Sequence, residues 1–324
     1  MAASTSSSMN NSSSTNSSAP HAPSGSPGKY PKIEVLAALV VGLAAFGFAP
    51  ILVRLAPDTS PLVLVVYRTV FAALMLVPFW LWKRSREPRS GKNRERLWIA
   101  LSGACLGIHF TCWIASLYYT SVASASVLVT IHPIIMILIE RFWFGRYFSK
   151  LTWTGVLMAF SGSLILGVSD SQIDQPFADP LFGNALAFTA ALVFVVYLLI
   201  GQKIRKKRAW IDYVFPIYFF AAGTCVAIAL ISGRDLLDIT TIGVWAGAGL
   251  AFGPQVLGHG AMNFAVKYVA PTLLSTLILV EPLLASTLAF FFFAELPPLT
   301  SMAAMLVILL GVGLTWRRKV SFGE

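Results

Sequence analysis

Two ionisable side chains lie deep inside apolar segments, each directly before a proline. Glu281 precedes Pro282, His132 precedes Pro133, and 149 residues separate the two pairs. An ionisable group in a bilayer costs several kcal/mol and usually faces a cavity or a partner. Glu281 could bind an amine or take up a proton, and His132 could share it. The alternative is that each makes a structural hydrogen bond to a neighbouring helix. Because proline lacks a backbone N–H, we also predict helix kinks at Pro133 and Pro282.

Other polar groups inside apolar segments extend this candidate set. Arg68 stands about two turns from the end of its segment, so its side chain could snorkel to the membrane surface as an anchor. The alternative is that it pairs with a carboxylate. Pro254 is expected to kink a third segment. Four further residues could supply hydrogen bonds to a cavity: His109, Gln255, His259 and Asn263.

Ten apolar segments are expected to position these residues. Each has about the 20 residues that cross ~30 Å of hydrocarbon as a helix. Long unbroken apolar runs favour helices over a barrel, because a helix satisfies its own backbone groups. We therefore predict an all-α integral membrane protein. The expected spans are Leu36–Val53, Leu62–Trp82, Leu97–Tyr119, Val122–Ile139, Leu151–Val168, Leu181–Gln202, Val214–Ser232, Ile242–Val266, Ala270–Ala294 and Leu299–Trp316.

The composition independently excludes a soluble globule. Of the 324 residues 56% are hydrophobic and only 12% are charged, and the mean hydropathy is +0.74. Such a chain cannot cover itself with polar groups, so a lipid bilayer is its expected surrounding. The net charge of +10 comes mostly from residues at the segment ends. We therefore expect no nucleic-acid partner.

The positions of the basic residues predict an orientation. If the first span starts in the cytoplasm, 21 of the 24 Lys and Arg residues lie on the inner side. Positive loops stay in the cytoplasm, so both termini are expected there, in a bacterial inner (plasma) membrane. Residues 1–32 are rich in Ser and Asn and are expected to form a disordered cytoplasmic tail.

An internal repeat organises the ten segments. One shift of 149 residues aligns Phe71 with Phe220, Pro133 with Pro282 and several further pairs, such as Gly162 with Gly311. The two copies are predicted to be residues 33–168 and 181–318. Five spans per copy is an odd number, so the second copy enters the membrane from the opposite side. This is an inverted repeat, an architecture of many secondary transporters.

Scattered motifs in both copies resemble a known family. They are Gly47–Arg54 leading into Ser60, Pro61 and Arg68, then Tyr118–Ser121, Glu281–Pro282, Ala294–Glu295 and Gly311–Gly313. The chain resembles the EamA-like family of the drug/metabolite transporter superfamily over residues 33–318. The resemblance implies ten helices, cytoplasmic termini, a central cavity, and export or exchange of small metabolites. Arg146 departs from the pattern, because the family often has there an acidic residue like Glu295.

Motifs of other protein classes are absent from the sequence. No His-Glu-x-x-His motif, Gly-x-Ser-x-Gly elbow or Walker loop occurs, so we expect neither an enzyme nor a cofactor or metal. Uphill transport would need coupling to protons or to exchange. The predicted function is secondary transport of small molecules such as amino acids or related amphiphilic compounds, by rocking of the two halves around Glu281 and His132. The alternative is a passive channel or lipid scramblase on the same polar path.

Overall fold

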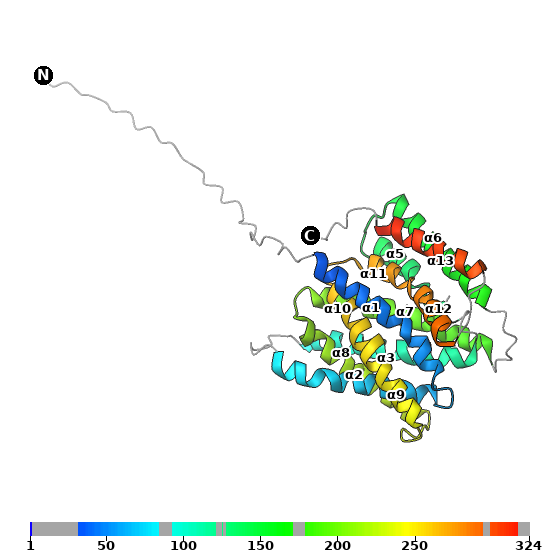
Figure 1. Ribbon diagram of the computed structural model, residues 1–324. Helices are drawn as coiled ribbons and strands as arrows, with labels where there is room; N and C mark the ends of the chain where they lie inside the picture. Colours follow the sequence, from blue (N-terminus) through cyan, green and yellow to red (C-terminus); the bar gives the residue numbers. More distant parts are fainter. Residues whose placement is uncertain are drawn as a thin grey trace.

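The computed structural model describes residue 1 and residues 32–83, 93–120, 125, 128–170, 179–293 and 299–316. Throughout these ranges the protein is helical and contains no strand, which confirms the all-α prediction for the part described (Figure 1). The first half contains α1 (Lys32–Arg54), α2 (Pro61–Lys83), α3 (Asn93–Tyr119), α5 (His132–Phe142) and α6 (Lys150–Asp170). The second half contains α7 (Pro180–Arg205), α8 (Trp210–Ile231), α9 (Thr241–Leu250), the π-helix η1 (Ala251–His259), α10 (Gly260–Ala265), α11 (Pro271–Ile278), α12 (Glu281–Phe293) and α13 (Leu299–Trp316).

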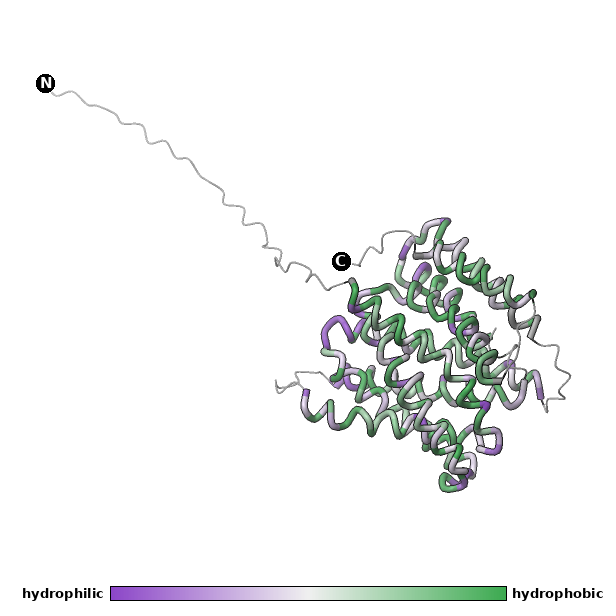
Figure 2. The backbone as a smooth tube through the Cα atoms, in the orientation of Figure 1, coloured by the Kyte–Doolittle hydropathy of each residue, from purple (hydrophilic) through white to green (hydrophobic). Residues whose placement is uncertain are grey.

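The helices have the length and surface of membrane spans. Among the described residues, six helical segments are long and apolar enough to cross a bilayer. Large apolar side chains such as Trp82 are exposed, at 76% in that case, and hydrocarbon is the surrounding that suits them. Figure 2 shows the helix bodies as hydrophobic, with hydrophilic residues mainly at helix ends and connections. The number ten stays a prediction, and most of the tail, residues 2–31, lies outside the described ranges.

Glycines show how the long helices run relative to each other. A methyl group added at Gly42 would come within 2.7 Å of Ala261 Cβ, and one at Gly249 within 3.1 Å of Leu52. Residues in the middle of α1 therefore lie beside α10, and residues near its end lie beside α9. The α1 helix packs antiparallel on the α9, η1 and α10 run. The end of α10 lies at the face where α1 begins.

The α3 helix packs closely on two helices of the second half. A methyl group at Gly103 would approach Ile217 O within 2.6 Å, and one at Gly107 would approach Ala221 O within 2.7 Å. The α3 and α8 helices thus run parallel with their backbones in near contact, as small residues permit. Gly183 at the start of α7 lies beside Thr120 at the end of α3, so these two helices run antiparallel.

One face of the bundle collects positive charge. Lys83 ends α2, and Lys203 and Arg205 lie in the last turn of α7. At the same face Arg208 forms an ion pair with Glu95 at the start of α3. We call this side, where α1 also begins, the basic face. Its position agrees with the clustering of Lys and Arg in the sequence.

Two expected spans are interrupted. The span predicted over 242–266 consists of α9, η1 and α10, with Pro254 inside the π-helix. The span predicted over 270–294 is divided after Ile278 by a turn, in which Val280 N donates to Leu277 O at 3.1 Å. Pro282 therefore stands at the start of α12 instead of kinking one continuous helix. Pro133 likewise lies in the first turn of α5. The ring of proline clashes with the preceding turn, which explains both breaks.

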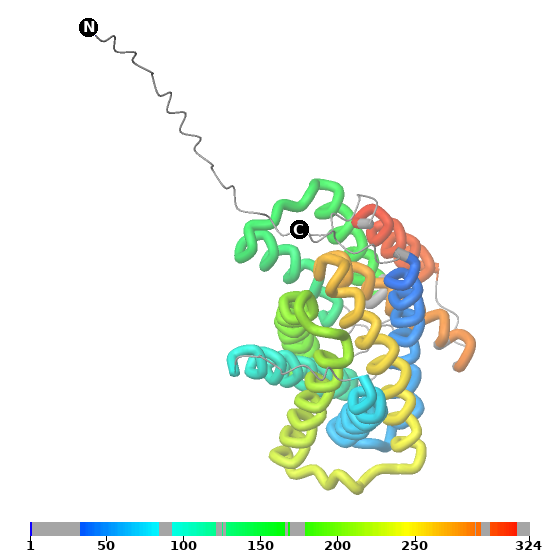
Figure 3. Tube along the Cα trace, turned by 90° about the vertical axis from the view of Figure 1, so that its left-hand side faces the viewer, coloured from blue at the N-terminus to red at the C-terminus, as the bar shows by residue number. Residues whose placement is uncertain are grey.

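The α6 and α13 helices form a pair at the edge of the bundle, as the turned view shows (Figure 3). They pack mainly against each other. A methyl group on Gly155 would come within 2.7 Å of Gly311 O, and one on Gly311 within 2.7 Å of Gly155 O. The two backbones meet through glycines, so this contact tolerates no larger side chain.

Gly311→Val should therefore destabilise the protein. Overpacking a close contact costs about 1–3 kcal/mol of the free energy of unfolding. The three cysteines are free and buried, so a thiol-reactive dye can follow thermal unfolding in detergent. Gly313→Val is the matched control, because nothing lies within 4 Å of a methyl group at Gly313. Equal melting temperatures of the two variants would contradict the close contact.

Candidate functional site

A small cavity that several ionisable side chains line lies between the two halves of the chain. Its volume is about 50 Å³. Residues of α1, α2, α3 and α5 from the first half and of α7, η1, α11 and α12 from the second half line it. Six of the residues singled out from the sequence are part of this lining: Arg68, His109, His132, Pro254, His259 and Glu281. The structure thus brings residues far apart in the sequence to one place. Their roles in binding stay predictions.

Arg68 is buried, with 2% of its surface exposed. Its Nε donates a hydrogen bond to Gln255 Oε1 at 3.2 Å, and its guanidinium lies 3.9 Å from the centre of the Phe110 ring. An amide oxygen and an aromatic face replace part of the hydration that the cation loses. The expectation that Arg68 could snorkel to the membrane surface is therefore wrong. The side chain points inward because α2 is packed between α3, α8 and α9.

Gln255 holds Arg68 from the π-helix. Arginine can only donate hydrogen bonds, so the amide oxygen of Gln255 must face it. The amide nitrogen of Gln255 is buried without a partner among the described residues. Tyr218 Oη donates to the backbone oxygen of Gln255 at 2.5 Å, which satisfies one carbonyl of the widened helix. Pro254 removes one donor from the ladder, and π-helical turns often occur at functional sites.

Three histidines and several aromatic rings surround the cavity. The His259 ring packs edge-on against Phe46 at 4.9 Å and Phe110 at 4.8 Å, and its Nδ1 has no partner among the described residues. His109 Nδ1 donates to Ala190 O at 3.0 Å, which fixes α3 against α7. Its Nε2 is then the nitrogen that can accept a proton or a hydrogen bond. The walls are mainly apolar, with a few polar atoms.

His132 and Glu281 occupy equivalent places in the two halves. Each is the first residue of a helix, α5 or α12, directly after a turn and before a proline. The His132 ring lies 4.9 Å from the ring of Phe194. Glu281 is partly exposed, within the cavity lining.

Asn263 lies behind the cavity instead of in its lining. Its Nδ2 donates to His259 O at 2.8 Å, and its own backbone oxygen accepts from Arg205 Nε at 2.8 Å. Asn263 thus supports α10 next to the histidine. Its expected role as a hydrogen-bond donor to the cavity stays a prediction, since the residue is buried in the helix contact.

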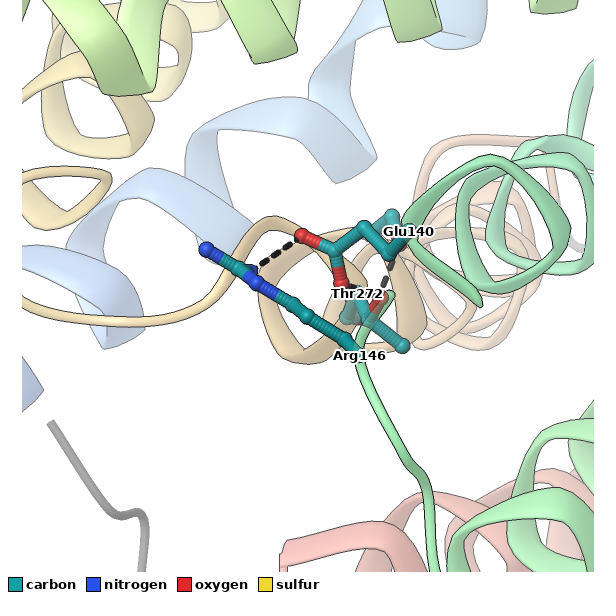
Figure 4. A network of polar contacts seen from close by, with 4 residues as sticks. Glu140, Arg146 and Thr272 are labelled. Atoms are coloured by element: carbon teal, nitrogen blue, oxygen red, sulfur yellow. Dashed lines mark hydrogen bonds and ion pairs between the residues drawn. The ribbon is translucent and has the colours of Figure 1, made fainter. Parts of the chain in front are cut away.

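One polar cluster was not predicted from the sequence. The carboxylate of Glu140, in the last turn of α5, is 1% exposed. It binds Arg146 Nη1 at 2.6 Å and accepts a hydrogen bond from Thr272 Oγ1 at 2.5 Å (Figure 4). An acidic residue six positions before an arginine was the available signal. Thr272 gave none, because its contact joins residues 132 apart.

Two helical halves and a polar cavity between them define a class, that of polytopic membrane proteins built from two repeats. The model of the EamA-like transporter family matches residues 32–168 and again residues 181–317. The chain belongs to the EamA-like transporter family. The resemblance seen in the sequence is confirmed.

Similar proteins occur in archaea and bacteria. Two uncharacterized transporters of Archaeoglobus fulgidus are 26% and 25% identical to this chain, cover 88% and 87% of it, and match over 97% and 96% of their own lengths. The uncharacterized transporter YdfC of Bacillus subtilis is 23% identical and covers 89% of this chain and 92% of its own length. A solved structure described only as the crystal structure of a protein has a TM-score of 0.69 at 16% identity. It covers 87% of this chain and 98% of its own chain. It shares the fold.

Gln255→Leu should destabilise the protein, because it removes the acceptor of the buried Arg68 Nε. An unsatisfied buried donor costs about 1–3 kcal/mol. We expect a lower melting temperature in the thiol-dye assay. Gln202→Leu is the control, since Gln202 is partly exposed in the last turns of α7. If both variants melt together, Gln255 does not stabilise Arg68.

Proposed function

We propose that the protein is a secondary carrier that exports or exchanges amino acids or related amphiphilic compounds. The single observation that carries this proposal is the placement of Arg68 and Glu281 on the wall of one cavity. A guanidinium can hold a carboxylate, and a carboxylate can hold an amine. The aromatic walls offer apolar surface to the remainder of such a molecule.

Alternating access between two inverted repeats is the proposed mechanism. Packing on both sides of the cavity supports it. The α1 helix packs on the α9, η1 and α10 run, and α3 packs on α7. A shift of 149 residues exchanges these two pairings, as expected for halves related by a two-fold axis in the membrane plane.

The size of the cavity supports a state that must open before it accepts a substrate. About 50 Å³ gives room for about four water molecules at ~10–15 Å³ each. Pockets that hold small ligands measure roughly 300–1,000 Å³. In the proposed cycle the two repeats therefore separate on one face to admit the substrate and then on the other to release it.

The proposed location is a bacterial inner membrane, with the basic face and both termini in the cytoplasm. The basic residues at the ends of α2 and α7 support this orientation. The sequence holds no Walker loop, so uphill transport would use a proton or exchange gradient. Glu281 and His132 are the groups proposed to take up a proton.

A passive channel or lipid scramblase is the second candidate function, because a polar cavity between repeats also suits a permeation path. The two candidates differ in kinetics. A carrier shows saturable flux that substrate on the opposite side accelerates. A pore shows flux that rises linearly with concentration and ignores that substrate.

Counterflow in proteoliposomes tests the carrier proposal. Liposomes are preloaded with the twenty standard amino acids and placed in an external amino acid mixture. They should release a few of the amino acids selectively, as measured by mass spectrometry. Glu281→Gln removes a charged hydrogen-bond partner worth about 1.5–3 kcal/mol, so we expect roughly a ten- to hundredfold slower exchange.

Glu34→Gln is the matched control for this change. Glu34 is exposed in the first turn of α1, so its variant should exchange at the wild-type rate. If Glu281→Gln exchanges amino acids selectively at the wild-type rate, Glu281 is not part of the transport pathway. Linear flux without acceleration by substrate on the opposite side would favour the pore.

A further inference from the structure

The cluster of Glu140, Arg146 and Thr272 joins the two repeats outside the cavity. Glu140 and Arg146 belong to the first half, and Thr272 lies in the first turn of α11 in the second half. Both oxygens of the buried carboxylate are used, one by Arg146 and one by Thr272. Gly145, with a φ of 63°, makes the turn after α5, and Arg146 N donates to Glu140 O at 3.0 Å. The loop thus returns the arginine to the carboxylate.

The cluster lies at the basic face. Gly42 in the middle of α1 contacts Ala261 at the start of α10, and the antiparallel packing carries the end of α10 from there toward the start of α1. Only the connection 266–270 separates α10 from α11, so the start of α11 and its Thr272 stay at that face. Glu140 stands in the last turn of α5, opposite Thr272.

The same two segments carry both the cavity wall and the cluster. His132 begins α5, and Glu140 stands eight residues further along it. Eight residues of helix span about 12 Å. In the second half, Thr272 precedes Glu281 by nine residues across α11 and the following turn. A movement of α5 away from the α11–α12 segment at the basic face therefore breaks the cluster and changes the cavity together.

The opposite face differs at the position equivalent to Glu140. The repeat position of Glu140 is occupied by Ala289. Among the described residues, uncharged side chains make polar contacts between the halves at that face. They include Thr59 Oγ1 with Thr240 Oγ1 at 3.3 Å and Thr120 Oγ1, which donates to Asn184 Oδ1 at 2.9 Å. Charged hydrogen bonds are the stronger kind, so the Glu140 cluster holds the basic face more firmly than an uncharged contact would.

We propose that Glu140, Arg146 and Thr272 form a lock that keeps the basic face closed and must open once in each transport cycle. This inference rests on the alternating access proposed above. The lock acts at the basic face, so the carrier at rest favours the state closed toward that face. Glu140 acts on the conformation of the carrier and does not touch the substrate.

Hydrogen–deuterium exchange of the full chain in nanodiscs tests the lock without any substrate. In Glu140→Gln and Thr272→Ala we expect at least about twofold more deuterium uptake at the basic face, in residues 139–150 and 266–274. We expect less uptake at the opposite face, in residues 55–60 and 232–240, because opening one face closes the other. A merely local loss of structure at the basic face would not lower deuterium uptake at the opposite face.

Controls separate the lock from loss of structure. Glu34→Gln changes an exposed carboxylate at the basic face, and Thr287→Ala removes an exposed hydroxyl that donates to Leu283 O in its own helix. Both should match the wild type. Thr272→Ala removes only one hydroxyl, so it tests the proposal even if Glu140→Gln folds poorly.

Two results would overturn the lock: uptake in Thr272→Ala that rises at both faces, or uptake that changes at neither. Opposite changes at the two faces support it. The counterflow experiment decides the carrier proposal separately. The variants could show opposite changes of deuterium uptake at the two faces while the wild type shows linear flux that substrate on the opposite side does not accelerate. That combination would contradict the carrier proposal, and the protein would then be a pore gated by this lock.

Discussion

Hydrocarbon offers no hydrogen bonds, and the backbone polar groups of this protein inside the membrane must therefore find their partners within the chain. Most of the backbone does so in regular helices. In the described ranges, irregular backbone within the spans is found around the cavity, in the π-helix η1 and in the turns before α5 and α12. Irregular backbone at this depth is stable where it is buried in protein or lines a polar space. The location of the cavity thus follows from where the helices are interrupted.

The two halves share a backbone arrangement but carry different side chains at equivalent positions. His132 and Glu281 share one place in the fold, after a turn and before a proline, yet one is a base and the other an acid. Glu140 and its repeat position Ala289 differ in the same way. The repeated backbone gives the symmetry that two equivalent conformations need. In the proposed alternating-access cycle, the differing side chains would make those conformations unequal in energy and so give the carrier a preferred resting state.

Local patterns were sufficient to predict much of this protein. Apolar segment length predicted the helices, and prolines marked the places where α5 and α12 begin. The position of Arg68 was sufficient to suspect a site but not to decide where its side chain points, because that depends on Gln255 and Phe110 in other helices. The π-helix was not predictable from a single proline. The hydrogen bond between Glu140 and Thr272 could not be predicted either, because it depends on tertiary packing between segments that are distant in the sequence.

The hydrogen bond from Arg68 to Gln255 joins residues 187 positions apart. During synthesis α2 enters the membrane long before η1 leaves the ribosome. Arg68 therefore lacks its final hydrogen-bond acceptor, Gln255, during that time. A nascent chain that stops after the first half carries an unsatisfied cation in its second span. The first half by itself therefore lacks the acceptor that completes the burial of Arg68 in the full chain.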